Sequence, residues 1–448
     1  MKIAVVGSGV AGLGAAWRLS AEHEVILYEA ETRLGGHSNT VEVATGDGTT
    51  LAVDTGFIVY NERTYPNLIR LFEHLEVATE PSNMSFAVSV DKGRFEYAGS
   101  PAGLFAQRRN LVRPRLWRLL RDLRRFYRTA PAYLETTGDL PIGEYLRREG
   151  YSPTFMDDHL LPMAAAIWSC STAEIQSFPT KSFLRFNLNH GLMQFANRPQ
   201  WRTVSGGSRE YVRRLSAPFA ARARLGTPVA ALKRDRDGVT VIDRQGQSDR
   251  FDQVVLACHG DQARAILGPD ATPVEASVLD AFRYQTNRAL LHRDPELMPR
   301  RKGVWSSWNY LSGKTRDDER AVSVTYWMNR LQNLDLAVPL FVSLNPIEAP
   351  RSDLVEGEFS YDHPVFDSAA VAAQSRLPEI QGLARTWFCG SYCGYGFHED
   401  ALQAGLAVAE ALGCPAPWVD EVVPASPAAK IVAPERSLPV LDPGIAAE

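Results

Sequence analysis

The sequence predicts an α/β fold built on a Rossmann-like dinucleotide-binding domain, and three observations support this class. The chain opens with a short β-branched strand, "IAVV", which runs directly into a glycine-rich turn and the start of a helix. A second strand, "EVILYEA", follows and ends near Glu29. Close to the other end, residues 386–413 again read as strand, glycine loop and helix. Strands that alternate with helices favour a mainly parallel sheet covered by helices.

The first turn carries the pattern G-x-G-x-x-G at Gly7, Gly9 and Gly12. The first glycine makes the tight turn, the second lets a pyrophosphate approach the backbone, and the third lets helix and strand pack closely. Free N–H groups at the helix start favour an anion, and a carboxylate at Glu29 stands where ribose hydroxyls bind. The alternative is a glycine turn with a surface glutamate. The predicted dinucleotide contacts in this segment are Gly7, Gly9, Val10, Ala11, Gly12, Glu29 and Ala30.

Composition excludes several classes of protein. The 448 residues are 45% hydrophobic, which allows two or three domains, and a net charge of -4 gives no general attraction to nucleic acid or membranes. We recognise no signal peptide and no apolar run near the roughly 20 residues that span a bilayer. Five cysteines, sparse and odd in number, indicate a reducing compartment, and Cys389 and Cys393 lack a second ligand pair for a metal. We therefore expect a cytoplasmic protein without a metal site.

The stretch after Glu29, "AETRLGGHSNT", resembles the second FAD motif of the flavin amine oxidase superfamily, which includes protoporphyrinogen oxidase and the phytoene desaturases. The likeness continues in "VDTGFIVYNERTYPNL". It implies FAD as the cofactor, held by a Rossmann-like domain of the GR2 type. It also implies that Arg33, Gly35 and Gly36 pass close to the diphosphate and ribityl chain, and that the backbone at Val229 faces the adenine.

The segment "TWFCGSYCGYGFHEDALQAGLAVAEALG" resembles the third FAD motif of this superfamily, with Gly390 and Ser391 after the strand. The resemblance implies that Phe397, His398 and Glu399 begin a helix whose N-terminus points at the flavin N1–C2=O edge. The helix dipole would stabilise charge there by roughly 0.5–2 kcal/mol. Asp400 is interpreted as a first-turn acid. His398 contributes either its backbone or a proton; no catalytic base is identified, and the candidates near the flavin are His398, Tyr395 and Phe397.

Three departures separate the chain from typical amine oxidases. Phe397 stands where these enzymes often have a tyrosine of an aromatic cage, and Ser391 stands where many relatives have an acidic residue. Oxygen-using members usually carry a lysine near flavin N5, but the corresponding region reads "YQTNRALLH", with Asn287 and Arg288 and no lysine. These differences argue against amine oxidation with oxygen.

The resemblance implies a discontinuous FAD-binding domain and a discontinuous α+β substrate domain. Residues 226–256 predict a β-meander and a buried strand, and the resemblance implies that this segment returns the chain to the FAD-binding domain. Aromatic residues of the substrate segments, among them Trp308, Tyr310 and Tyr326, form either ordinary core or the wall of an apolar tunnel. The predicted boundaries are 1–80, 196–275 and 380–415 for the FAD-binding domain, 81–195 and 276–379 for the substrate domain, and 420–448 for a disordered tail.

Phrases such as "MAAAIWS", "NHGLM", "WRTVSGGS" and "GFHED" resemble a narrower bacterial group of NAD/FAD-binding proteins linked to fatty acyl modification. This resemblance implies an FAD-dependent oxidoreductase that desaturates a hydrophobic substrate, such as a methylated fatty acyl chain of a lipid, by hydride transfer to flavin N5. The alternatives are a flavin amine oxidase and a non-catalytic flavoprotein partner in lipid modification. The electron acceptor is not indicated.

Residues 108–128 contain nine arginines and one aspartate. Leu116, Leu119, Leu120 and Leu123 recur at helical spacing, which predicts an amphipathic helix from about 114 to 128. One interpretation is a solvated surface helix. The other is docking on an anionic membrane or an acidic carrier protein, which would place the enzyme peripherally on the inner face of the membrane. No nucleic-acid module accompanies the arginines, so RNA is not expected.

Overall fold

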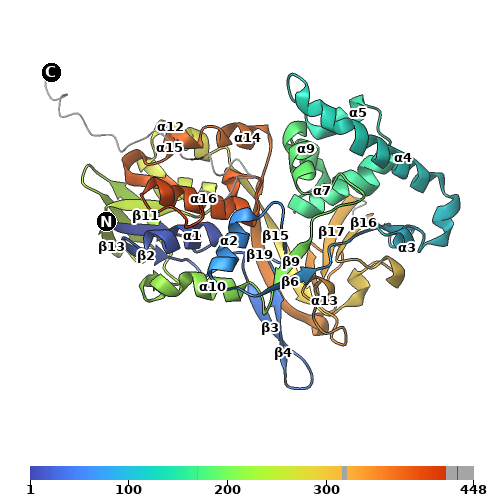
Figure 1. Cartoon of the computed structure of the whole chain (residues 1–448), viewed down its shortest axis with the longest axis horizontal. Helices are drawn as coiled ribbons and strands as arrows, with labels where there is room; N and C mark the ends of the chain where they lie inside the picture. Colours follow the sequence, from blue (N-terminus) through green and yellow to red (C-terminus); the bar gives the residue numbers. More distant parts are fainter. Residues whose placement is uncertain (169, 315–319, 420–430, 432–448) are drawn as a thin grey trace. The chain divides into compact units, whose positions relative to one another are not determined.

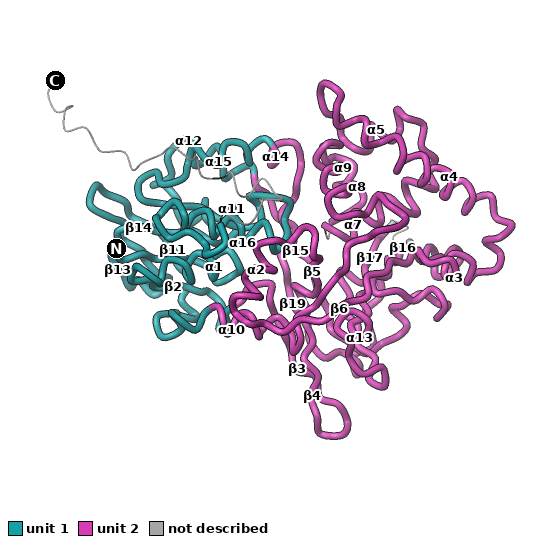
Figure 2. The backbone as a smooth tube through the Cα atoms, viewed as in Figure 1, with its two compact units in different colours: residues 1–34, 216–281, 372–448 teal, residues 35–215, 282–371 magenta. Residues whose placement is uncertain are grey.

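The computed structural model describes residues 1–168, 170–314, 320–419 and 431, which form two compact units (Figures 1 and 2). Each unit is assembled from separate parts of the chain, so strands far apart in sequence pair with one another. The predicted tail at 420–448 lies outside the described residues, apart from Ile431. Unit 1 comprises residues 1–34, 216–281 and 372–448, and unit 2 comprises residues 35–215 and 282–371.

Unit 1 contains a five-stranded parallel sheet in the order β10-β2-β1-β14-β20. The central strands are almost wholly buried, because the unit covers both faces of the sheet, and this explains their continuous apolar sequences. The predicted α/β, Rossmann-like class is confirmed. The strands are β1 (Lys2–Val6), β2 (Glu24–Tyr28), β10 (Ala223–Arg224), β14 (Gln253–Leu256) and β20 (Thr386–Phe388).

Two helices of unit 1, α1 (Val10–Leu19) and α16 (His398–Ala411), pack against each other beside this sheet. The predicted meander is also present, as an antiparallel sheet in the order β11-β12-β13 that leads into β14. The remaining elements are β11 (Val229–Arg234), β12 (Val239–Asp243), β13 (Ser248–Phe251), α11 (Gly260–Leu267), α12 (Pro273–Leu279) and α15 (Leu377–Ile380), with α14 (Ser368–Gln374) crossing the boundary between units.

Unit 2 is organised around a seven-stranded mixed sheet in the order β19-β15-β18-β17-β16-β7-β8. Strands β7 and β16 pair in parallel, and the other neighbours are antiparallel. The strands are β7 (Phe86–Val90), β8 (Phe95–Ala98), β15 (Arg283–His292), β16 (Trp308–Lys314), β17 (Arg320–Trp327), β18 (Phe341–Leu344) and β19 (Val355–Val365).

Smaller sheets and helices complete unit 2 (Figure 1). The arginine-rich segment folds as α4 (Pro114–Thr129), close to the predicted bounds. The sheets are β3 (Thr40–Ala44) with β4 (Thr50–Asp54), and β5 (Tyr60–Asn61) and β6 (Thr79–Ser82) on either side of β9 (Trp201–Val204). The other helices include α2 (Pro66–His74), α3 (Pro101–Leu104), α5 (Ile142–Arg148), α7 (Leu161–Trp168), α9 (Thr180–Asn189) and α10 (Arg209–Ser216).

The aromatic side chains of the sheet in unit 2 are largely core. Tyr310 and Tyr326 are buried in one hydrophobic cluster, and Trp308 packs against it. Trp308 and Tyr326 face each other across β16 and β17, with ring centroids 4.9 Å apart. These residues therefore belong to the ordinary hydrophobic core, which was one of the two interpretations. The apolar tunnel stays a prediction.

The compact units and the predicted domains divide the chain differently. Residues 35–80 and 196–215, which we assigned to the FAD-binding domain, group with unit 2, and residues 276–281 and 372–379, which we assigned to the substrate domain, group with unit 1. Long-range contacts explain the grouping with unit 2: β9 joins the two segments by pairing with β5 and β6, and the Asp54 carboxylate connects them to the rest of the unit by accepting a hydrogen bond from Gln332 at 2.9 Å. Such pairing depends on distant partners that local sequence does not reveal.

Candidate functional site

The glycine loop of unit 1 has the geometry that the motif predicts. Gly7 has φ of +103°, and a Cβ there would lie 2.7 Å from the Ala257 carbonyl oxygen. A Cβ on Gly12 would lie 2.0 Å from the Gly7 carbonyl oxygen. A Cβ on Gly9, in contrast, would meet nothing within 4 Å. Two glycines thus permit close packing of strand and helix, while the third borders open space at the start of α1, where a pyrophosphate fits.

Glu29 lies at the carboxyl end of β2, next to this loop. One carboxylate oxygen accepts hydrogen bonds from the backbone N–H of Ser8 at 2.8 Å and from its hydroxyl at 2.5 Å. The other oxygen accepts from the backbone N–H of Glu31 at 2.8 Å. A carboxylate has about four acceptor positions, so this fixed orientation leaves capacity for ribose hydroxyls.

Helices α1 and α16 approach each other unusually closely in unit 1. A Cβ on Gly405 would lie 2.1 Å from the carbonyl oxygen of Ala11. Since any larger side chain would separate the helices, glycine at this position brings the first turn of α1 near α16. The two helices that carry the first and third predicted FAD motifs are therefore held together by direct backbone contact.

The loop between β20 and α16 is fixed by two glutamine side chains. Gln381 donates to the carbonyl of Phe388 at 2.9 Å and accepts from its N–H at 3.0 Å. Gln374 donates to the carbonyl oxygens of Tyr392 at 2.9 Å and Gly394 at 2.5 Å. The loop that contains Gly390 and Ser391 is consequently held at both ends.

The start of α16 distinguishes the roles of its polar residues. Asp400 accepts a hydrogen bond from the N–H of Phe397 at 2.8 Å, which confirms its interpretation as a first-turn acid. Glu399 is buried and accepts from Gln403 at 3.1 Å. Desolvation by the surrounding protein lowers the pKa of His398 to about 3. Its half-buried ring is therefore neutral near pH 7. A neutral imidazole of such low basicity favours a backbone role over proton transfer.

The predicted FAD contacts fall almost entirely within unit 1. Val229 begins β11 beside a register irregularity, Ala30 is exposed, and Arg33 and Tyr395 are half-buried. Gly35 and Gly36 stand at the first residues of unit 2, both with positive φ. The contacts of these residues with FAD stay predictions. Those within unit 1 are Gly7, Gly9, Val10, Ala11, Gly12, Glu29, Ala30, Arg33, Val229, Gly390, Ser391, Phe397, His398 and Glu399.

The loop after the paired glycines is packed tightly inside unit 2. A Cβ on Gly56 would lie 2.2 Å from the His37 carbonyl oxygen, and a Cβ on Gly207 would lie 2.5 Å from Thr40. The buried Asp54 joins these segments, because it accepts hydrogen bonds from the Ser208 N–H at 3.0 Å and from the Ser208 and Thr40 hydroxyls. Burial raises the pKa of Asp54 to about 6.

A second polar cluster in unit 2 surrounds Asn287 on β15. The Asn287 amide nitrogen lies 2.9 Å from Nδ1 of His363, and its carbonyl oxygen accepts from Asn345 at 2.7 Å. The His363 ring stands 5.2 Å from the ring of His37, which stands 5.0 Å from Tyr361. Asn287 is fully buried, so the position is occupied by an uncharged, hydrogen-bonded amide.

Sequence reasoning missed both histidines of this cluster. His37 directly follows the glycine pair in "LGGHSNT", and that placement is a signal that could have identified it. His363 gives no comparable signal, because its proximity to Asn287 depends on the pairing of β15 with β19.

The donor set of unit 1 fits a dinucleotide: an open glycine turn at a helix N-terminus, an oriented carboxylate and two helices in backbone contact. When FAD is bound, Gly9, Glu29 and the start of α16 would hold its pyrophosphate, ribose and flavin ends, as predicted from the motifs. Among the described residues, no group of three or more His, Cys, Asp or Glu side chains could hold a metal ion. No helix in the same residues is long and apolar enough to cross a membrane.

Comparison with known proteins places this geometry among flavoproteins. Residues 10–292, more than half of the chain, match the family described as "Flavin containing amine oxidoreductase". The chain is 27% identical over 256 residues to the "Putative flavin-containing monoamine oxidase AofH" of Mycobacterium tuberculosis, covering 55% of this chain and 54% of that protein. It is 29% identical over 182 residues to 15-cis-phytoene desaturase of Narcissus pseudonarcissus, covering 37% of this chain and 31% of that protein.

The chain thus spans about half the length, or less, of the curated relatives it matches. Cyclohexylamine oxidase from Brevibacterium oxydans has a similar fold, with a TM-score of 0.64 and 15% identity over 92% of this chain and 99% of that one. At this level of identity the structural likeness concerns the fold alone.

Proposed function

Because the chain belongs to the family of flavin-containing amine oxidoreductases, with FAD as its cofactor, we propose that it is an FAD-dependent dehydrogenase of the desaturase type. The substrate that we propose is hydrophobic: a modified, for example methylated, fatty acyl chain of a lipid. The relative named phytoene desaturase supports a hydrocarbon substrate. The acyl chain itself rests on the sequence resemblance stated above.

The observation that carries the proposal is the buried amide of Asn287. Oxygen-using amine oxidases usually have a lysine in this region of the sequence. Here Asn287 is enclosed between Asn345 and His363, and its hydrogen bonds fill the position without charge. A buried lysine would need a different set of acceptors, because an ammonium group donates three hydrogen bonds and accepts none. The cluster therefore supports a dehydrogenase that passes electrons to an acceptor other than oxygen.

The reaction removes two hydrogens from adjacent carbons and leaves a double bond. When FAD is bound, it supplies the hydride acceptor, N5 of the flavin. The second hydrogen leaves as a proton to a base or to water. His398 is a weak base at a pKa of about 3, so this proton goes more readily to another acceptor.

We expect anaerobic holoprotein to lose its yellow flavin absorbance when mixed with lipid that carries methylated acyl chains, and to keep it with simple amines. Mass spectrometry should find product lipid lighter by two hydrogens. After reduction, reoxidation by air should be too slow to support turnover. Reduction by amines with rapid reoxidation in air would instead establish the second candidate, a flavin amine oxidase, which the relative AofH favours. Flavin that neither compound reduces would point to a non-catalytic flavoprotein.

A further inference from the structure

The segment that links α3 to α4 in unit 2 exposes three large apolar side chains. Val112 is 83% exposed, Leu111 53% and Trp117 51%. They lie on the 3₁₀ turn at Arg108–Val112 and on the first turn of α4. Figure 1 shows this link at the outer edge of unit 2 in that view. Clustered apolar exposure of this kind marks an interaction surface more often than a solvated one.

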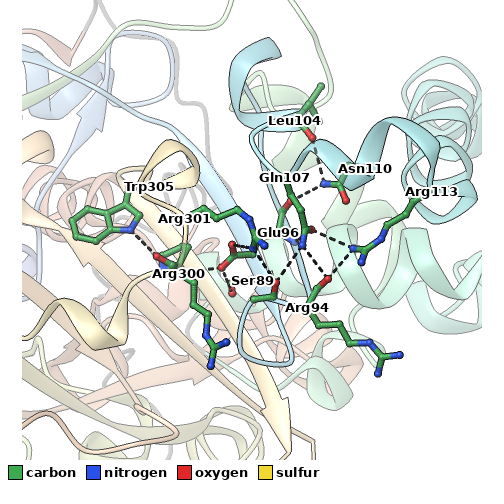
Figure 3. A network of polar contacts seen from close by, with 12 residues as sticks. Ser89, Arg94, Glu96, Leu104, Gln107, Asn110, Arg113, Arg300, Arg301 and Trp305 are labelled. Carbon is green, nitrogen blue, oxygen red and sulfur yellow. Dashed lines mark hydrogen bonds and ion pairs between the residues drawn. The ribbon is translucent and has the colours of Figure 1, made fainter.

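Hydrogen bonds of the neighbouring residues fix the backbone that carries these exposed side chains (Figure 3). The buried Gln107 accepts from the N–H of Glu96 at 2.9 Å and donates to the Arg94 carbonyl at 3.2 Å. The buried Asn110 donates to the Glu96 carbonyl at 2.8 Å, and Arg113 donates to the Arg94 carbonyl at 2.8 Å. Residues on both sides of Leu111 and Val112 are thus tied to Arg94 and Glu96, at the start of strand β8.

Arginines surround these apolar residues. Trp117, Arg121, Arg124 and Arg128 follow one another at i, i+4, i+7 and i+11, so they share one exposed face of α4. Arg108, Arg109 and Arg118 are also exposed. Arg108, Arg109, Arg118, Arg124 and Arg128 form no ion pair with any residue that the structure describes.

Arg113, next to Val112, lies among further arginines. Burial and then the charges of Arg109, Arg115, Arg301 and Arg94 lower the pKa of Arg113. A surface with arginines around protruding apolar residues is complementary to an anionic bilayer, where phosphates meet the guanidinium groups and acyl chains meet the side chains.

The structure also shows that most leucines of the predicted amphipathic helix are not available to a membrane. Leu116, Leu119 and Leu123 are buried within unit 2, so the apolar face of α4 is part of the core. Arg125 is half-buried with its guanidinium 3.9 Å from the Tyr151 ring, and Arg115 pairs with the buried Asp158 at 2.7 Å. These two arginines therefore stabilise the packing of α4 within unit 2 and are not part of its exposed face.

We propose that Leu111, Val112 and Trp117, surrounded by Arg108, Arg109, Arg118, Arg121, Arg124 and Arg128, form a membrane-docking surface that binds anionic phospholipid bilayers. The two apolar residues at the turn and the tryptophan enter the interface, and the arginines contact phosphates. The inference is independent of the proposed function, because it concerns where the protein binds and not which compound it oxidises.

Vesicle flotation of the full-length holoprotein tests the docking surface. We expect binding to vesicles of phosphatidylcholine with phosphatidylglycerol and little binding to phosphatidylcholine alone. At roughly 1 kcal/mol per arginine, the variant Arg108→Gln/Arg109→Gln/Arg118→Gln should bind about 100-fold more weakly. The variant Leu111→Ser/Val112→Ser should bind roughly tenfold more weakly or worse.

Matched variants elsewhere provide the controls. Arg222→Gln/Arg236→Gln/Arg244→Gln removes three exposed arginines from unit 1, and Leu336→Ser removes a leucine that is 68% exposed in unit 2. Both should bind vesicles like the unchanged protein. FAD content and thermal unfolding should be the same in all four variants, because none of the substituted side chains is buried.

A depth measurement separates insertion from simple charge attraction. Lipids brominated near the headgroup should quench the fluorescence of Trp117, measured as the difference between the unchanged protein and Trp117→Phe. Equal binding to neutral and anionic vesicles, or unchanged binding by the two surface variants, would overturn the proposal. So would a failure to bind vesicles together with arginine-dependent binding of an acidic carrier protein or RNA.

Discussion

Glycines of one motif in unit 1 are needed for different reasons. Gly12 is needed because a Cβ would collide with the backbone of Gly7. Gly9 has φ of -62°, which any residue adopts, and borders open space. The protein alone therefore gives no packing reason for glycine at position 9, which agrees with the predicted approach of the FAD pyrophosphate to this turn.

We expect Gly9→Val to fold and to lose FAD, with cofactor content reduced at least about tenfold, because the branched side chain fills the position of the pyrophosphate. Flavin absorbance per chain measures this. Gly46→Val, at another open glycine in unit 2, is the control and should keep its FAD. Gly12→Ala should instead lower the yield of folded protein. If Gly9→Val retains full FAD content, the pyrophosphate is not held at this turn.

At the scale of elements, the contact of α1 with α16 determines how the cofactor motifs assemble. The two helices belong to opposite ends of the chain, and Gly405 lets them meet at backbone distance. The pair therefore acts as a clamp that sets the position of the glycine loop relative to the start of α16.

Replacing Gly405 by alanine should push helices α1 and α16 apart. The added Cβ overlaps the Ala11 carbonyl, and overpacking of this kind costs about 1–3 kcal/mol of stability. We expect a lower unfolding midpoint in urea and weaker FAD retention on dilution. Ala411→Val adds bulk to the exposed end of the same helix and should change neither by much. Similar effects in both variants would show that helix propensity, and not the crossing, limits stability.

The sequence predicts those parts of the molecule whose cause is local. Gly7, Gly9 and Gly12, the strand "IAVV" and the capping of α16 by Asp400 depend on neighbours within a few residues, and each is found where it is predicted. Helix α4 was predicted, but its covered face was not, because regular spacing gives no sign that Leu116, Leu119 and Leu123 are core. Which face of a helix is covered depends on distant chain.

Other features could not be read from sequence for the same reason. The Asp54 network joins Thr40, Ser208 and Gln332, and the amide of Asn287 meets His363 only through the pairing of two long strands. Such polar clusters leave no periodic pattern, because each member satisfies a partner from another segment. The limits of the compact units have the same non-local origin.

For the whole molecule, buried histidines make stability dependent on pH. Burial lowers the pKa of His190 and of His292 to about 4, whereas an unfolded histidine titrates near 6.5. Below pH 6.5 these histidines take up protons in the unfolded chain but not in the folded one. The free energy of unfolding therefore decreases as the pH is lowered. Asp54, whose pKa is raised to about 6, opposes this between pH 6 and 4.

We expect a net loss of stability between pH 7 and pH 5, to which His190, His292 and Asp54 together contribute about 2 kcal/mol, seen as a lower thermal midpoint at the acid end. His292 tests the cause. Its Nδ1 accepts from the N–H of Asp294 at 3.1 Å, so Nε2 carries the proton toward Ser343. The variant His292→Asn keeps an acceptor for Asp294 but does not titrate, and it should show a shallower dependence on pH. An unchanged slope would assign the acid sensitivity to other groups.

The pairing of β1 with β14 and of β14 with β20 means that the sheet of unit 1 cannot be completed until late segments of the chain have been synthesised. β1 is synthesised before its neighbour β14, which follows about 250 residues later, and β20 and α16 follow β14. β1 can pair with β2 at once, but β1 lacks its other neighbour β14, and α1 lacks its neighbour α16, until those segments have been synthesised. Because we predict that the start of α16 holds the flavin end of FAD, we expect the complete cofactor site to form only after residue 398 has been synthesised, and a chain interrupted before that residue to retain less FAD than the full chain.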